Sequence, residues 1–178
     1  MEFNLLATTD QLTISQGCSE LWMNLREVGD NKPIVDRSRI KGLIRAKTSL
    51  KPINAIKKLR ELLEKQPGKF MTIYRILPIQ ERVKTTLGDI VEKAHIMASK
   101  IPEEDSFRIT LEKRRTNLSS KEIIEAVASG IHRRVDLENP DWIVLLEIVG
   151  GNTGISVVKP EMVLNVQKTK YRLSKCRD

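Results

Sequence analysis

Apolar residues over positions 1–77 follow two spacings, which predict four strands and two helices. Short apolar runs favour strands over 3–8, 32–36, 40–48 and 70–77. Between them, two stretches repeat apolar residues at intervals of three and four, the spacing of one helical face. These stripes are Cys18, Leu21, Trp22, Leu25 and Val28, then Ile53, Ile56, Leu59, Leu62 and Leu63. The predicted order is therefore strand, helix, two strands, helix and strand.

A different pattern covers residues 78–168. After a connector at 79–82, apolar residues from 83 to 101 keep the spacing of one long amphipathic helix that ends before Pro102. Apolar and polar residues alternate from Phe107 to Glu112, as in a strand with one buried face. The run Ser119–Glu122 fits a capping box at the start of another helix. Trp142–Val149 is apolar almost throughout, as in a strand covered on both faces.

The order of these elements predicts the fold. A strand, a helix and a strand in succession favour a right-handed parallel crossover. The glycines between 150 and 154 favour a tight connection to an antiparallel strand over 155–158, and residues 162–166 favour one more edge strand. We expect an α+β or α/β chain with a ferredoxin-like βαββαβ domain over 1–77, a second domain over 78–168 and a basic tail over 169–178.

The charge balance favours an anionic partner. The chain has 31 Lys and Arg residues against 23 Asp and Glu, a net charge of +8, as is common in nucleic-acid-binding proteins. Ten basic and two acidic residues lie between Arg37 and Lys65, so this stretch predicts either a solvated face or a surface that binds an anion. Aromatic residues make up only 4% of the chain, which argues against a surface that stacks single-stranded bases.

Three adjacent cations, Lys113, Arg114 and Arg115, follow the alternating strand. Neighbouring positive charges repel one another, so this triplet favours solvent or an anion. The next predicted helix begins a few residues later, and its backbone donors would lie at the same edge, an arrangement that binds phosphate. This helix is expected to end with His132, Arg133 and Arg134, where positive charge either stabilises the helix C-terminus or contacts nucleic acid.

The sequence shows no pattern typical of an enzyme or a metal site. Cys18 and Cys176 each lack a neighbouring thiol, and His95 has no carboxylate or second histidine at ligand spacing. Neither a phosphate-binding glycine loop nor a nucleophile elbow is present. We therefore expect no catalytic residue, no metal and no cofactor. The short apolar runs and the lack of a signal peptide predict a cytoplasmic protein without a membrane span.

Three stretches of the second half, Phe107–Arg115, Val135–Asp141 and Gly154–Val158, resemble the THUMP domain. This domain is an RNA-binding module of thiouridine synthases, RNA methyltransferases and pseudouridine synthases. The chain is most similar to THUMP-containing adaptors for tRNA cytidine acetylation, which lack a catalytic domain, in a compact form of archaeal or bacterial type. The resemblance implies that the chain binds the acceptor stem and single-stranded end of tRNA while a separate tRNA acetyltransferase acts elsewhere on the molecule.

The same resemblance suggests which side chains contact RNA. Lys113, Arg114 and Arg115 match the basic motif of the family and are the leading candidates. Their positions add Lys121, Arg134 and Lys159 as further candidates.

Other functions stay open on the sequence. The chain is alternatively a small tRNA-modifying enzyme, or the RNA-binding subunit of a thiolation or methylation system. A protein–protein scaffold is a third interpretation, since the two modules offer several strand edges for pairing. An adaptor must itself contact an enzyme, so this last interpretation is a component of the first.

Overall fold

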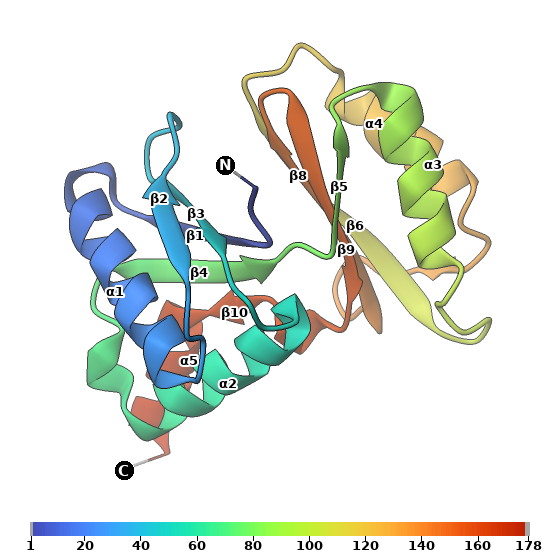
Figure 1. Cartoon of the computed structure of the whole chain (residues 1–178). Helices are drawn as coiled ribbons and strands as arrows, with labels where there is room; N and C mark the ends of the chain where they lie inside the picture. Colours follow the sequence, from blue (N-terminus) through green and yellow to red (C-terminus); the bar gives the residue numbers. More distant parts are fainter. Residues whose placement is uncertain (1, 177–178) are drawn as a thin grey trace. The chain divides into compact units, whose positions relative to one another are not determined.

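Two five-stranded sheets organise the chain, one in each of two units that the computed structural model describes over residues 2–176. Among the described residues, the first unit comprises 2–78 together with 161–176, and the second comprises 79–160. The protein is thus a mixed α+β chain, with five α-helices over the described residues (Figure 1).

The sheet of the first unit is antiparallel throughout and has the strand order β10-β4-β1-β3-β2. Its strands are β1 (Leu5–Thr9), β2 (Ile34–Arg37), β3 (Leu43–Lys47), β4 (Ile73–Pro78) and β10 (Leu164–Asn165). The predicted strands of 1–77 are confirmed, with bounds that differ by a few residues. β1 lies in the middle of the sheet because Leu5, Leu6 and Ala7 are apolar in succession and are buried on both faces.

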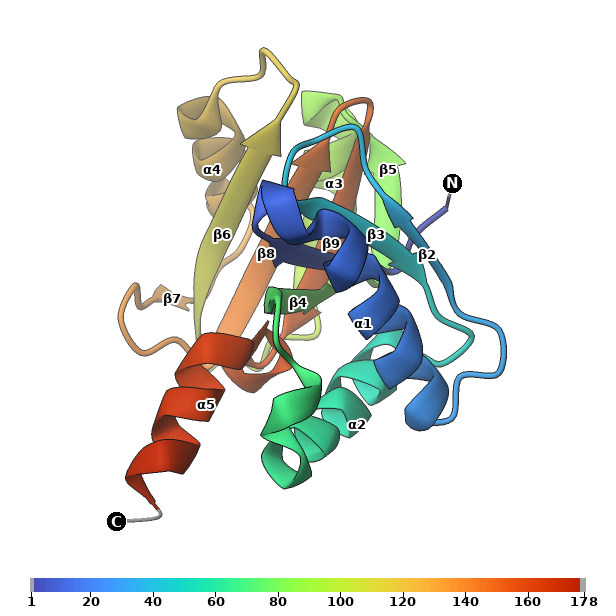
Figure 2. The same ribbon diagram turned by 90° about the vertical axis from the view of Figure 1, so that its left-hand side faces the viewer.

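Two helices of the first unit follow the predicted stripes. They are α1 (Ile14–Glu27), preceded by the 3-10 turn η1 (Gln11–Thr13), and α2 (Pro52–Lys65), followed by η2 (Pro67–Lys69). Leu21 and Leu25 of α1 and Ile56, Leu59 and Leu63 of α2 are fully buried. The two helices pack against each other and against the sheet (Figures 1 and 2), so the apolar stripes form the core of this unit.

The end of the chain differs from the predicted basic tail. Val166–Lys175 forms the helix α5, which packs against α2 and β4 of the first unit. The side chain of Asn165 accepts a hydrogen bond from Lys168 N and caps the helix, and Val166 and Thr169 are buried. Two buried positions within ten mostly polar residues make a stripe too short to recognise. Residues 177 and 178 of the predicted tail lie outside the described residues.

The predicted edge strand over 162–166 is present as the two residues of β10, but it belongs to the first sheet. Leu164 pairs with Ile76 of β4, so residues 161–168, which the sequence pattern placed in the second domain, group with the first unit. The apolar pattern predicts a strand here without specifying its neighbour, because pairing depends on residues almost ninety positions away in the chain.

The sheet of the second unit has the strand order β5-β9-β8-β6-β7. Its strands are β5 (Glu81–Lys84), β6 (Ser106–Arg114), β7 (Arg134–Val135), β8 (Trp142–Val149) and β9 (Asn152–Val158). β6 and β8 are parallel, from Phe107 opposite Trp142 to Arg114 opposite Val149, and β9 returns antiparallel to β8. The predicted parallel pair with a crossover helix and an antiparallel return strand is confirmed.

Two helices, α3 (Leu87–Ala98) and α4 (Ser120–Ser129), lie side by side on the sheet of the second unit (Figure 1). The alternating residues Phe107, Ile109 and Leu111 of β6 face them. The core between helices and sheet also contains Ile90 and Ala94 of α3, Ile123 and Val127 of α4, Val144, Leu146 and Ile148 of β8, and Ile155 and Val157 of β9.

Two boundaries in the second unit differ from prediction. Residues 81–84, expected as a connector and the start of a long helix, form strand β5, and α3 begins only after Thr86, whose side chain accepts from Asp89 N. Val83 of β5 and Leu87 of α3 are four residues apart and pack on the same core. In the sequence, Val83 therefore looks like part of the apolar stripe of the helix, although it belongs to a strand. The helix expected to reach Arg134 ends at Ser129, and Arg134 lies in β7.

Candidate nucleic-acid interface

β5, β6 and β8 all end on the same side of the second sheet. We call this side, where the carboxyl ends of the three strands lie, the carboxyl edge. β6 and β8 are parallel, and β5 runs in the same direction because both β5 and β8 are antiparallel to β9. Gly150 N, just after β8, donates to Arg114 O at 2.9 Å and ties the ends of β8 and β6 together. α3 and α4 both begin at this edge, since each directly follows one of its strands (Figure 2). Two helix N-termini therefore add positive potential here.

Lys113 and Arg115 are exposed at the carboxyl edge. The ammonium of Lys113 donates to the carbonyl of Leu118 at 2.5 Å, which holds it beside the loop that leads to α4. Arg115 has a φ of 56°, in the left-handed region, so the backbone turns sharply out of β6 at this residue. Both cations thus lie next to the start of α4.

Arg114 differs from its two neighbours because side chains alternate between the faces of a strand. Its Nη1 lies 2.6 Å from Oε2 of Glu147, whose side chain is only 1% exposed. The guanidinium of Arg114 therefore compensates a buried carboxylate on β8. The charge triplet in the sequence predicted three equivalent cations, but the structure engages the middle one inside the unit. A contact between Arg114 and RNA stays a prediction.

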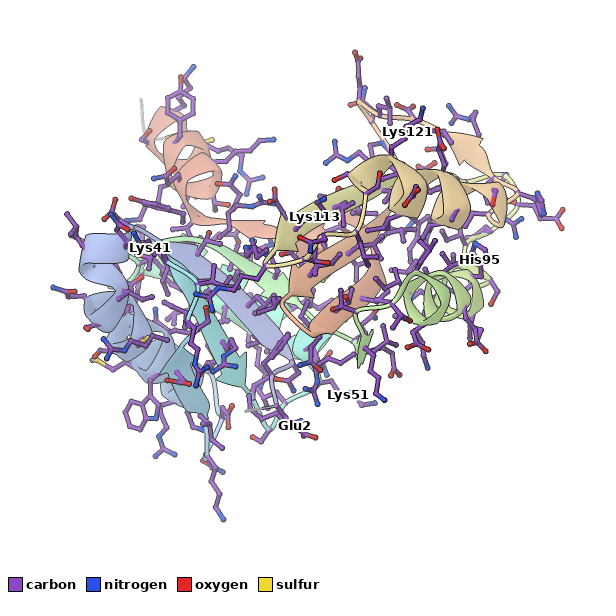
Figure 3. All side chains as sticks on the ribbon, turned by 90° about the horizontal axis from the view of Figure 1, so that it is seen from above. Glu2, Lys41, Lys51, His95, Lys113 and Lys121 are labelled. Carbon is purple, nitrogen blue, oxygen red and sulfur yellow. The ribbon has the colours of Figure 1, made fainter. Side chains whose placement is uncertain are left out.

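Lys121 lies in the first turn of α4, with its side chain 82% exposed and 3.9 Å from Glu125 (Figure 3). The predicted cap is present, because Ser119 Oγ accepts from Glu122 N at 3.3 Å. The structure thus brings Lys113, Arg115 and Lys121 to one edge at the start of α4. This juxtaposition of cations and a helix N-terminus suits phosphate groups.

Arg134 and Lys159, the other two predicted contacts, lie at the opposite edge of the same sheet. Arg134 of β7 pairs with Ser106, the first residue of β6, and Lys159 follows the end of β9, which is opposite the start of β8. Arg134 is 3.5 Å from Asp136, and its side chain is 66% exposed. The six predicted contacts therefore separate into four at the carboxyl edge and two at the other edge.

Lys159 lies in a cluster around Trp142 that the sequence pattern did not predict. Its ammonium is 4.4 Å from the centre of the indole ring and 3.4 Å from Asp105. The indole nitrogen of Trp142 donates to the same carboxylate at 2.8 Å. Lys100 lies 5.7 Å from the ring centre, and burial lowers its pKa. Residues from three separate stretches meet here, so only their spacing in the folded chain reveals the cluster.

Acidic side chains of the stretch Val135–Asp141 order the loop at this opposite edge. Asp141 accepts from the backbone and hydroxyl of Ser106, both at 2.8 Å, and these hydrogen bonds lower its pKa. The pKa of Asp136 is lowered by hydrogen bonds from Asn139 N and Glu138 N. The carboxylates therefore bind backbone groups of their own unit, which gives this stretch a structural role.

His95 and Cys18, which were considered above as possible metal ligands, both lie in contact with other groups of their own unit. His95 Nε2 lies 2.9 Å from the carbonyl of Val127, between α3 and α4. Burial raises the pKa of Cys18, with smaller effects from Asp36 and Arg37. Over the described residues, no three His, Cys, Asp or Glu side chains are grouped so that they could hold a metal ion. None of the described helices is long and apolar enough to cross a membrane.

Comparison with known proteins shows which domain family the second unit matches. Residues 84–158 match the family model of the THUMP domain. The chain is 28% identical over 124 residues to THUMP domain-containing protein 1 of Bos taurus, a match that covers 65% of this chain and 34% of that protein. The chain thus spans about a third of the length of the curated relative it matches.

Two solved structures share the fold across most of the chain. One is PH1313 from Pyrococcus horikoshii Ot3, with a TM-score of 0.59 and 24% identity over 88% of this chain and 55% of that one. The other is a 4-thiouridine synthetase in a complex with RNA and ATP, with a TM-score of 0.54 and 15% identity over 88% of this chain and 41% of that one. Both matches include residues of the first unit as well as the second, since the second unit alone is less than half of the chain.

Proposed function

Because the chain carries a THUMP domain over residues 84–158, we propose that it binds tRNA and presents it to a separate enzyme that modifies the tRNA. THUMP domains are associated with RNA binding and tRNA modification, and one protein of similar fold is a thiouridine synthetase in a complex with RNA. The observation that carries the proposal is the carboxyl edge, where Lys113, Arg115 and Lys121 surround the start of α4.

The chemistry of this edge fits an RNA backbone. Flexible ammonium groups and helix donors neutralise phosphates without selecting bases. Duplex RNA is recognised largely by its shape and by phosphate and ribose contacts, because its deep groove excludes side chains. The proposed partner is therefore a structured RNA. The resemblance to the adaptor family implies that the site of contact on it is the acceptor stem and single-stranded end of tRNA.

The proposed enzyme is a tRNA cytidine acetyltransferase, and this chain supplies no catalytic group itself. Support comes from the three stretches that resemble acetylation adaptors. Two of them, Phe107–Arg115 and Val135–Asp141, contribute to opposite edges of the second sheet. The third, Gly154–Val158, forms most of β9 in its middle. These stretches therefore define the frame of the domain as well as its charged edge.

The first unit is proposed to be a ferredoxin-like domain. Its elements follow the order β1, α1, β2, β3, α2, β4, and the four strands lie in the order β4-β1-β3-β2 with antiparallel neighbours. Two interleaved βαβ units, each with one strand of the other between its strands, produce this arrangement. β10 and α5 extend it at the β4 side.

A pair of matched variants tests which edge of the second sheet binds tRNA. Lys113→Gln with Lys121→Gln removes two charges from the carboxyl edge, and Arg134→Gln with Lys159→Gln removes two from the opposite edge. Measured by fluorescence anisotropy, the first pair should lower the slope of log affinity against log salt by about 2. The second pair should leave that slope nearly unchanged. A reversed order would assign binding to the edge around Trp142, and wild-type binding that does not depend on salt would contradict the proposal.

A reconstitution tests the adaptor role. With tRNA and acetyl donor, a tRNA acetyltransferase should form acetylcytidine faster when this chain is added, as measured by mass spectrometry of nucleosides. The chain alone should leave tRNA unmodified under the same conditions. A modified nucleoside formed by the chain alone would favour the alternative of a small tRNA-modifying enzyme. Association with the acetyltransferase should also persist after nuclease treatment, because an adaptor contacts its enzyme directly.

A further inference from the structure

A groove of about 360 Å³ lies in the first unit, beside the loop that joins β2 to β3. Three cations line it, Arg37, Arg39 and Lys41, and all three are exposed. The other wall comes from the turn between β1 and α1, where Leu12 is 84% exposed. Within five residues the hairpin therefore presents three positive charges to one hollow, next to an exposed apolar side chain.

Backbone contacts with the end of β1 hold the hairpin in place. Thr9 N donates to Gly42 O at 2.9 Å, and a Cβ at Gly42 would lie 2.6 Å from Thr9 O. Gly42 also has a φ of 72°, so both its conformation and this close approach require glycine. Within the loop, Ser38 Oγ accepts from Ile40 N at 2.9 Å. The cations therefore project from an ordered frame, which lowers the entropic cost of binding.

The nearby charges leave the groove positive. The carboxylate of Asp10 accepts from Leu12 N at 2.8 Å, and Asp36 forms an ion pair with Arg45 at 2.9 Å. Both acids are thus engaged by groups of the unit. Ile14, the first residue of α1, also lines the groove, and the N-cap residue Thr13 makes no side-chain hydrogen bond to the first turn. The positive end of the α1 dipole therefore adds to the cations.

We infer that this hairpin groove is a second contact for RNA, in which Arg37, Arg39 and Lys41 bind backbone phosphates and Leu12 packs against a ribose or base. The inference rests on the proposed function of tRNA binding and extends it to the first unit, outside the THUMP domain. Charge complementarity selects a polyanion, and guanidinium groups pair with phosphate oxygens through two parallel hydrogen bonds. The regularly spaced phosphates of a polyanion can pair with all three of these cations, which lie within five residues of the sequence.

Other lysines of the same unit provide a matched control. Lys51, Lys57 and Lys65 are exposed before and along α2, and they line neither this groove nor a hairpin. Lys41 precedes β3 and Lys51 follows it, so the two lie beyond opposite ends of that strand (Figure 3). Changing either set of three residues to Gln lowers the net charge equally, so a general effect of charge would affect both variants alike.

The test compares tRNA binding by the full chain with the triple variants Arg37→Gln/Arg39→Gln/Lys41→Gln and Lys51→Gln/Lys57→Gln/Lys65→Gln. The hairpin variant should lower the salt slope of affinity by about 3, one for each lost phosphate contact, and the control by less than about 1. The variant Arg37→Lys/Arg39→Lys/Lys41→Arg keeps the charges, so it should bind more tightly than the triple Gln variant, although it loses the paired guanidinium contacts of Arg37 and Arg39. Equal melting temperatures would show that the variants fold alike.

The outcomes separate this inference from the proposed function. If the Lys113 and Lys121 variant weakens binding while the hairpin variant binds like wild type, the hairpin contact is wrong and the THUMP edge stands. If the hairpin variant and its control weaken binding equally, the contact is wrong because only net charge matters. If wild type does not bind tRNA, both proposals fail.

Discussion

At the scale of single residues, Gly130 leaves room for the ring of His95. A Cβ at position 130 would lie 2.1 Å from the Cε1 atom of His95, whose ring nitrogen is held by the carbonyl of Val127. Gly130→Ala should therefore lower the free energy of unfolding by about 1–3 kcal/mol, measured by urea denaturation, because it overpacks the contact between α3 and α4.

Two further variants make this prediction specific. His95→Ala in the background of Gly130→Ala should recover part of the loss, since the clash disappears. Gly88→Ala serves as a control because a Cβ at that helical position meets nothing within 4 Å, and it should stabilise the chain by about 0.5–1 kcal/mol. A Gly130→Ala variant as stable as wild type would show that His95 moves freely.

Arg114 is predicted to affect folding more than RNA binding. Arg114→Ala removes the guanidinium that lies 2.6 Å from the buried carboxylate of Glu147, which should cost about 1–3 kcal/mol of unfolding free energy. Lys113→Ala changes an exposed side chain and should stay within about 0.5 kcal/mol of wild type. Thermal and urea unfolding of the two variants measures this difference. If both were equally stable, the pair between Arg114 and Glu147 would not matter for the fold.

At the scale of elements, Asp30 joins the end of α1 to the connection between β3 and α2. Its buried carboxylate accepts from Thr48 Oγ1 and Ser49 Oγ, both at 2.6 Å, and from Ser49 N and Lys32 N. Burial raises the pKa of Asp30, but these hydrogen bonds outweigh that effect and hold the pKa below its ordinary value. The folded state therefore favours the ionised carboxylate over the protonated one.

The sign of the pH dependence follows from this lowered pKa. Because the folded-state pKa is below the unfolded value of about 3.9, the contribution of Asp30 is complete above that pH and is lost as the pH falls through the folded-state pKa. Asp30→Asn should be less stable than wild type at pH 7, and the difference should shrink below about pH 4. Urea denaturation across this pH range measures it, and a constant difference would contradict the assigned role.

Most elements could be predicted from local pattern, whereas their partners could not. α1 and α2 follow their apolar stripes, and β8 follows an apolar run, because burial of one face or both leaves a direct trace in residue order. β5 was missed because Val83 continues the stripe of α3, and α5 was missed because it buries few residues. β5 was therefore missed because it shares a core with the helix that follows it, and α5 because most of its surface is exposed.

At the scale of the whole molecule, positive charge is concentrated in separate places. Six of the exposed cations described above lie at the carboxyl edge and the hairpin groove, namely Lys113, Arg115, Lys121, Arg37, Arg39 and Lys41. Each phosphate contact releases counterions from RNA. The logarithm of tRNA affinity should therefore fall with the logarithm of salt with a slope of about −4 to −5, a loss of about 250- to 1,000-fold between 50 and 200 mM. Anisotropy titrations measure this slope, and a value near −1 would leave room for a single phosphate contact only.

Local order along the chain was enough to predict most of the helices and strands and the parallel crossover, because these depend on residues close in sequence. The folded chain was needed to show that Arg114 pairs with Glu147, that Lys159 lies over Trp142, and that β10 joins the first sheet. These features depend on residues that lie far apart in the sequence. Strand alternation and long-range pairing therefore separated cations that look equivalent in the triplet into one that supports the fold and two that are exposed at the carboxyl edge.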